Sequence, residues 1–195
     1  MSFFRMAVWV EGGLGIIALI VGFFFGLHLW QHIWCDWETV WQVIWGLAPL
    51  IAGYFVLLAL PISGIQRVGN LVRELFLQYM ATLKLWQLTL IAALAGIGEE
   101  LFFRGLLQLG LYYFFGDVWI AILISSLLFG LAHAITPTYF VLSFVVSIYF
   151  GWIFVHTGNL LVPIAIHALY DLFVLLYLRH TLCKSLSIDD DDASC

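Results

Sequence analysis

Residues 85–115 read LWQLTLIAALAGIGEELFFRGLLQLGLYYFF, and this stretch decides the fold of the chain. It is long and apolar enough to cross a lipid bilayer as a helix, which takes about 20 such residues. Near its middle, however, lie Glu99, Glu100 and Arg104. A charged side chain at mid-membrane costs about 2.5–3.5 kcal/mol on insertion scales, so a chain that keeps several there is expected to use them.

The chain as a whole is strongly apolar. Of its 195 residues, 64% are hydrophobic and only 10% are charged, whereas a soluble domain has about 25% charged residues. Because the charged residues are too few to cover a water-exposed surface, lipid must solvate much of the chain. The composition predicts an all-α, polytopic membrane helix bundle with a single membrane-embedded domain over residues 1–178 and a polar, acidic tail over residues 179–195. The sequence contains no basic patch that would indicate a nucleic-acid partner.

We expect about six transmembrane helices and one surface helix. The six apolar segments cover approximately residues 7–29, 40–60, 85–115, 118–134, 139–156 and 160–178. Residues 63–84 carry apolar side chains at helical spacing together with Arg67, Arg73, Glu74 and Lys84, a pattern typical of an amphipathic helix on the membrane surface. Lys and Arg flank the segments on one side only, which predicts that both termini are cytoplasmic. The short chain and short loops favour a bacterial inner (plasma) membrane.

Six ionisable residues are clustered in three of the predicted membrane helices: Glu99, Glu100, Arg104, His133, His167 and Asp171. Glu100 and Arg104 are four residues apart, which places them on one face of a helix as an ion pair that braces the bundle. One Arg cannot neutralise three carboxylates, and two histidines remain, so a structural role does not account for the whole set. The other four residues suit the activation of a water and the stabilisation of an oxyanion. They would also suit a divalent metal such as zinc.

Three short motifs contain these residues. Residues 99–104, EELFFR, fit EExxxR; residues 129–133, FGLAH, fit FxxxH; and residues 167–171, HALYD, fit HxxxN/D. In this order, on successive membrane helices, they resemble the motifs of the CPBP family of intramembrane peptidases, and the resemblance covers about residues 81–178. That family includes CAAX prenyl endopeptidases and bacterial proteins linked to bacteriocin processing and self-immunity.

The resemblance implies an intramembrane endopeptidase that hydrolyses a peptide bond of a membrane-associated or lipidated substrate. Carried over to this chain, it makes Glu99 the base that activates a water and makes His133 a second contact of that water. His167 and Asp171 would stabilise the oxyanion of the tetrahedral intermediate. The supporting residues would be Glu100, Arg104 and Phe129.

The last motif ends in Asp171, where many prenyl endopeptidases of the family have Asn. An ionised carboxylate repels an oxyanion, so Asp171 must be protonated, orient His167 or bind a metal. Family members have been described both as metalloproteases and as metal-independent glutamate peptidases, and the sequence leaves both open. The candidate ligands of a divalent metal are Glu99, His133, His167 and Asp171.

Two other functions fit parts of the pattern. A non-catalytic immunity or scaffold protein could share the fold, although it would have no need to retain Glu99. An ion-coupled transporter also buries Glu and His, but the sequence shows no internal repeats and no paired broken helices. Other intramembrane peptidases fit less well, because the sequence contains no HExxH, GxSG or GxGD motif. The expected partners are membrane lipids and a membrane-associated peptide or protein substrate.

Overall fold

The computed structural model describes residues 1–189, with side chains as far as Leu182, and this part of the chain is folded into helices. In chain order these are α1 (Phe3–Phe24), the 3-10 turn η1 (Leu29–His32), α2 (Trp37–Ala59), α3 (Ser63–Tyr79), α4 (Leu85–Glu100), the π-helical segment η2 (Leu101–Gln108), α5 (Leu109–Phe115), α6 (Val118–Ala132), α7 (Pro137–Thr157) and α8 (Leu161–Asp189). The predicted all-α bundle is confirmed.

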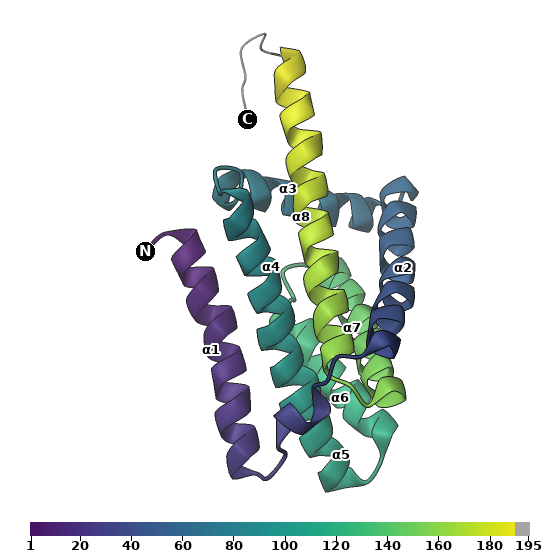
Figure 1. The fold of residues 1–195 in the computed structure, drawn as a ribbon. Helices are drawn as coiled ribbons and strands as arrows, with labels where there is room; N and C mark the ends of the chain where they lie inside the picture. Colours follow the sequence, from purple (N-terminus) through teal and green to yellow (C-terminus); the bar gives the residue numbers. More distant parts are fainter. Residues whose placement is uncertain (190–195) are drawn as a thin grey trace.

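The helices form one bundle around α8 (Figure 1). α8 packs against α4 on one side and α2 on the other, and α1 covers the outer side of α4. α6 and α7 pack together behind this layer. α3 lies across one end of the bundle, so the amphipathic helix predicted within residues 63–84 is present and runs across the other helices.

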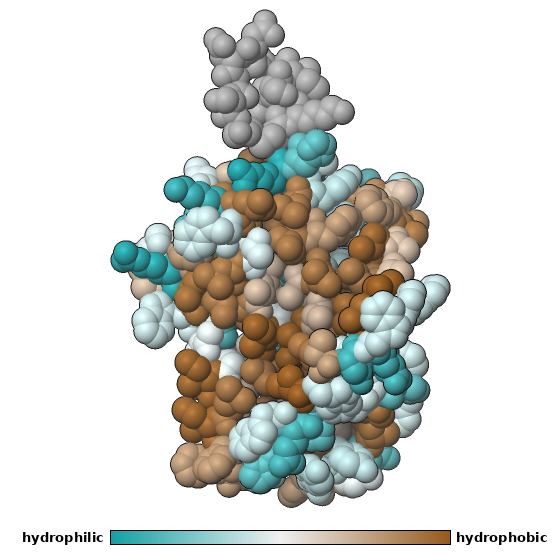
Figure 2. Space-filling model, in the orientation of Figure 1, coloured by the Kyte–Doolittle hydropathy of each residue, from teal (hydrophilic) through white to brown (hydrophobic). Residues whose placement is uncertain are grey.

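Among the described residues, four helical segments are long and apolar enough to cross a membrane: α1, α2, α7 and α8 as far as Leu182. Their outward side chains include large exposed apolar residues such as Trp9, Phe24 and Trp45. Apolar side chains also cover much of the face shown in Figure 2. Water would not tolerate so much exposed apolar surface, whereas a bilayer requires it. The chain is therefore a membrane protein.

The other two predicted spans take a less regular form. Residues 85–115 follow one continuous helical path through α4, η2 and α5, and its middle carries the charged residues. α6 is apolar but only 15 residues long. A total of six passes, with both termini cytoplasmic, stays a prediction.

The helix boundaries differ from expectation near both ends of the chain. α1 ends at Phe24 because Gly26, with φ of +71°, begins the turn that leads to η1. Leu29 is then buried against Gly22 instead of extending the helix. α8 continues to Asp189, into the segment predicted to be a polar tail, while residues 190–195 of that tail lie outside the described residues.

A buried asparagine joins two loops at the end of the bundle away from α3. Asn159 is 1% exposed. Its amide donates to the backbone oxygen of Trp34 at 2.9 Å and to Oγ1 of Thr39 at 3.0 Å, and its Oδ1 accepts from the backbone N–H of Leu161 at 3.0 Å. Because α8 begins at Leu161, these bonds hold the start of α8 against the start of α2.

We expect Asn159→Ala to lower the free energy of unfolding by about 1–3 kcal/mol, because it leaves buried polar groups without partners. Thermal unfolding in detergent, followed by tryptophan fluorescence, measures the change as a lower Tm. His156→Ala is a suitable control, since His156 is exposed at the nearby end of α7. A Tm equal to that of the wild type would contradict the assigned role of Asn159.

Candidate active site

Side chains from the three motifs meet inside the bundle. Glu99 and Glu100 lie at the end of α4, and Arg104 lies in η2. His133 directly follows α6, and α8 carries His167 and Asp171. Ion-pair or hydrogen-bonding distances connect all six side chains into one cluster. The structure thus brings together all six residues of the predicted set.

A close approach of α4 and α8 sets this geometry. A Cβ added at Gly96 would lie 2.8 Å from both the backbone nitrogen and the Cβ of Ala168, so only glycine fits there. Small residues at such positions allow two membrane helices to pack with their backbones in near contact. Ala168 directly follows His167, and the contact therefore places His167 opposite the carboxylates at the end of α4.

Arg104 occupies the buried centre of the cluster, where it and Glu100 are 1% and 0% exposed. Its Nη1 donates to Oε1 of Glu100 at 3.0 Å, and its Nη2 donates to the backbone oxygen and Oγ of Ser147 on α7, at 3.1 and 2.8 Å. The guanidinium also lies 4.9 Å from the ring of Phe129 and 5.3 Å from that of Phe150. Arg104 therefore ties η2 to α4, α6 and α7 through donors and a ring-stacking plane that lysine lacks.

His167 shares the same oxygen of Glu100. Its Nδ1 lies 2.8 Å from Oε1 of Glu100, and its ring stacks on Phe150 with centroids 5.2 Å apart. An ionised carboxylate can only accept, so Nδ1 carries the hydrogen. The other ring nitrogen, Nε2, faces Oε2 of Glu99 at 4.0 Å and Oδ2 of Asp171 at 3.6 Å.

His133 is oriented in a similar way. Its Nδ1 lies 2.9 Å from the backbone oxygen of Phe129, and because a carbonyl only accepts, Nδ1 is again the donor. The ring stacks on that of Phe129 with centroids 4.3 Å apart. Its Nε2 points to Oε2 of Glu99 at 3.8 Å. Phe129 therefore contacts both His133 and Arg104, and its supporting role stays a prediction.

Three atoms face one another inside the cluster: Oε2 of Glu99, Nε2 of His133 and Nε2 of His167. When both imidazoles are neutral, all three are hydrogen-bond acceptors. Oε2 of Glu99 is buried and has no hydrogen-bond partner among the described residues. It is too far from Nε2 of His133 and of His167 for direct hydrogen bonds, but near enough for one water molecule to bridge these atoms. The side chains of His133 and Asp171 are 27% and 36% exposed, so the cluster reaches the protein surface on their side.

Residues 81–173 match the family model described as "Type II CAAX prenyl endopeptidase Rce1-like". This segment contains all three motifs. This segment, slightly less than half of the chain, is similar to that family. The match confirms the resemblance that the motifs indicated, and it supports peptidase chemistry at the coarse level of a CAAX-protease-like membrane protein. Comparisons with curated proteins and with solved structures gave no match.

The Rce1-like cluster was also a candidate metal site. Within the described range, no group of three or more His, Cys, Asp or Glu side chains is arranged to hold a metal ion. Oε2 of Glu99 lies 3.8 Å from Nε2 of His133 and 4.0 Å from Nε2 of His167, so these side chains face one another without a direct hydrogen bond. A divalent metal held by Glu99, His133, His167 and Asp171 stays a prediction, and the reaction proposed for this cluster uses none.

Glu11 of α1 lies outside the Rce1-like segment and was not predicted to belong to the site. Its carboxylate interacts electrostatically with those of Glu99 and Asp171 and with the His167 ring, and its Oε2 is buried without a hydrogen-bond partner in the described part of the chain. α1 comes this close because Gly98 leaves room for the backbone carbonyl of Glu11, which any Cβ there would meet. The signal in the sequence was a lone carboxylate within the first apolar segment.

Proposed function

We propose that the protein is an intramembrane endopeptidase that uses an activated water to hydrolyse a peptide bond in a membrane-associated or lipidated substrate. One observation carries the proposal: the buried Oε2 of Glu99 lacks a partner among the described residues and faces the Nε2 atoms of two oriented histidines. The Rce1-like match over residues 81–173 supports the reaction class and a CAAX-type, lipid-bearing substrate.

Glu99 acts as the general base in this proposal. A water held between Oε2 of Glu99 and Nε2 of His133 gives its proton to Glu99 as its oxygen attacks the carbonyl carbon of the substrate. The resulting tetrahedral intermediate carries its negative charge on the former carbonyl oxygen. Glu99 then returns the proton to the nitrogen of the leaving amine, the C–N bond breaks, and the carboxylate is regenerated.

His167 stabilises the oxyanion. Its Nδ1–H is held by Glu100 at 2.8 Å, so in the doubly protonated ring the Nε2–H points into the cluster and can donate to the oxyanion. Asp171 lies on the same side, with Oδ2 3.6 Å from Nε2. Of the three roles that the sequence left open for Asp171, we propose that it orients His167 and balances its charge as a positioning residue.

Asp171→Asn is therefore expected to lower kcat by roughly ten- to a hundredfold, which is less than the loss of about 10²–10⁴ for a group that acts on the reacting atoms directly. KM should change little, because Asp171 acts through His167 and not on the substrate. Steady-state kinetics in vesicles give both constants, and circular dichroism checks the fold. Full activity in the Asn variant would show instead that a neutral hydrogen-bond donor suffices at this position.

A cleavage assay tests the proposed reaction. Full-length protein reconstituted in vesicles is incubated with three peptides: a prenylated peptide ending in a CAAX box, the same peptide without the prenyl group, and an apolar membrane-inserted peptide. Mass spectrometry should find new termini in a lipidated or inserted peptide and none in the soluble one. Failure to cut any membrane-bound peptide, by protein whose helicity and Tm show it to be folded, would contradict the proposal.

A further inference from the structure

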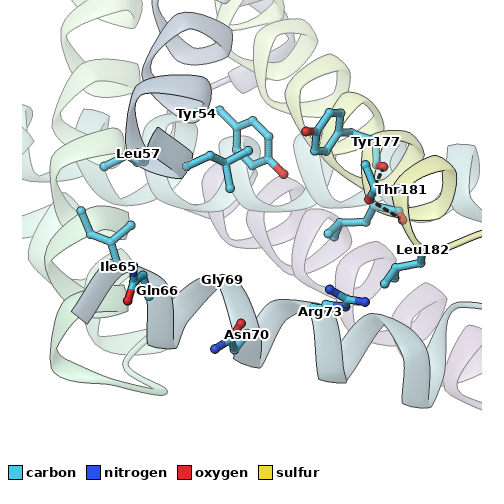
Figure 3. A pocket seen from close by; sticks show the side chains of 12 residues that line it. Tyr54, Leu57, Ile65, Gln66, Gly69, Asn70, Arg73, Tyr177, Thr181 and Leu182 are labelled. Carbon is cyan, nitrogen blue, oxygen red and sulfur yellow. Dashed lines mark hydrogen bonds between the residues drawn. The ribbon is translucent and has the colours of Figure 1, made fainter. Parts of the chain in front are cut away.

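A pocket of about 460 Å³ lies between α2, α3 and α8 and shares no residue with the Glu99 cluster. Figure 3 shows α3 along its floor, with Tyr54 of α2 and Tyr177 of α8 pointing toward each other above it. The rings of these two tyrosines are in contact, with centroids 5.6 Å apart, and both also contact Phe55 and Phe173. The walls of the pocket are therefore held in place by an aromatic cluster that joins α2 to α8.

The lining of this pocket combines one cation with uncharged polar groups. Arg73 lies on the floor and makes no hydrogen bond or ion pair with the described residues, and the amides of Gln66 and Asn70 lie on the same helix. The remaining polar groups are the hydroxyls of Tyr54, Tyr177 and Thr181. Among the described side chains, none that lines the pocket is acidic, so its chemistry favours a ligand with one net negative charge and several hydrogen-bond acceptors.

The rim toward α2 is apolar. Leu57 and Leu58 line the pocket there, and Leu58 continues onto the exposed outer surface of α2, which is long and apolar enough to span a membrane. A ligand with a polar head and an apolar chain could thus place its head on α3 and its chain along α2.

The pocket also lies at the basic end of the bundle. The start of α1, all of α3, the start of α4 and the far part of α8 are found at this end (Figure 1). Five of the six Lys and Arg whose side chains are described lie on or directly before these elements, and the sixth is the buried Arg104; the five are Arg5, Arg67, Arg73, Lys84 and Arg179. Basic groups at the end of a helix bundle attract anionic lipids at the membrane surface.

We propose that this pocket binds one anionic phospholipid, with its phosphate on Arg73 and the neighbouring amides and an acyl chain along α2. A guanidinium offers paired donors that match phosphate oxygens. A zwitterionic lipid would add a second cation beside Arg73, and no acidic side chain among the described pocket residues could pair with it. This site is independent of the hydrolysis proposed above, so either proposal can fail without the other.

Two variants separate charge from space. Arg73→Gln removes the cation and keeps a polar side chain of similar length. Gly69→Leu leaves Arg73 in place but fills the pocket, because Gly69 lines it and a Cβ there would meet no atom within 4 Å. Arg67→Gln is the matched control, since Arg67 is an exposed cation of the same helix that does not line the pocket.

The experiment measures lipid carried by each full-length protein. Each is reconstituted in phosphatidylcholine with a minor fraction of phosphatidylglycerol, released into the gas phase, and analysed by native mass spectrometry. We expect the wild type and Arg67→Gln to retain one phosphatidylglycerol in preference to phosphatidylcholine. Arg73→Gln should retain about five- to tenfold less, the effect of one basic group near an anionic headgroup, and Gly69→Leu should lose it similarly.

Other outcomes would overturn the assignment. Equal retention of the two lipids by the wild type would show no preference for an anionic headgroup. Equal losses in Arg67→Gln and Arg73→Gln would assign the preference to the basic surface as a whole. Displacement of bound phosphatidylglycerol by a short apolar peptide with a free C-terminal carboxylate, and not by its amidated form, would assign the pocket to a peptide end.

Discussion

Glu99→Gln is expected to lower kcat of peptide hydrolysis by about 10²–10⁴, the range for a lost general base, while the protein stays folded. Glutamine has nearly the shape of glutamate but cannot accept the proton of the attacking water. The Oε2 atom makes no hydrogen bond to a described residue, so the substitution breaks no bond there. Product formation in vesicles, measured by mass spectrometry beside the Tm of the same preparation, gives both quantities.

The neighbouring carboxylate supplies a matched control. Glu100→Gln is the same chemical change one residue later, but Glu100 accepts from both Arg104 and His167. We therefore expect Glu100→Gln to lower Tm, whereas Glu99→Gln leaves it near that of the wild type. Wild-type turnover in Glu99→Gln would remove the proposed base from the mechanism. A Glu99→Gln, His133→Gln double variant should be little slower than Glu99→Gln alone, because groups that act on one water are not additive.

The sequence predicted the helices and the motif geometry best where the signals are local. Apolar segments of membrane length are strong signals, and α2, α7 and much of α8 lie where composition placed them. The pair formed by Glu100 and Arg104 is equally local, since residues four apart in a helix lie on one face. The resemblance carried by three motifs then predicted that Glu99, His133 and His167 would share one cluster.

The details that shape the site depend on contacts between helices, which no local pattern encodes. Two close approaches between helices could not be predicted, that of Gly96 to Ala168 and that of Gly98 to Glu11. Membrane helices tolerate glycine at many positions, so a glycine in the sequence does not by itself mark a helix contact. For the same reason Glu11 was missed, although its isolation in an apolar segment was visible. The π-helical segment η2 around Arg104 could not be predicted either, because no residue pattern distinguishes it from an α-helix. Such segments recur at functional sites.

The metal question shows a related limit. From the sequence alone, a metal site can be predicted wherever helices that carry two acidic residues and two histidines meet. Whether these residues can bind a metal depends on the separations of their ligand atoms. Those separations depend on side-chain orientation, which stacking on Phe129 and Phe150 sets here. The position of an aromatic ring thus decides what the polar side chain beside it can do.

Arg104→Ala is expected to lower the free energy of unfolding by about 3–5 kcal/mol, the cost of removing one partner from a buried ion pair. Glu100 would then be a buried carboxylate whose remaining partner is His167. The backbone oxygen and hydroxyl of Ser147 would lose their donor as well. Activity would fall with the folded fraction, because Glu100 also holds His167 in place.

Two further variants separate this structural role from a chemical one. Arg104→Lys keeps the charge but cannot donate to Glu100 and Ser147 at once, so its Tm should fall between those of the wild type and Arg104→Ala. A Glu100→Ala, Arg104→Ala double variant removes both charges, so its loss of stability should be smaller than the sum of the two single losses. Thermal unfolding in detergent, followed by tryptophan fluorescence, measures all five proteins, the single Glu100→Ala variant included. If Arg104→Ala purified with the wild-type Tm yet cut no substrate, the guanidinium would have to act on the reacting atoms, which its burial between Phe129 and Phe150 opposes.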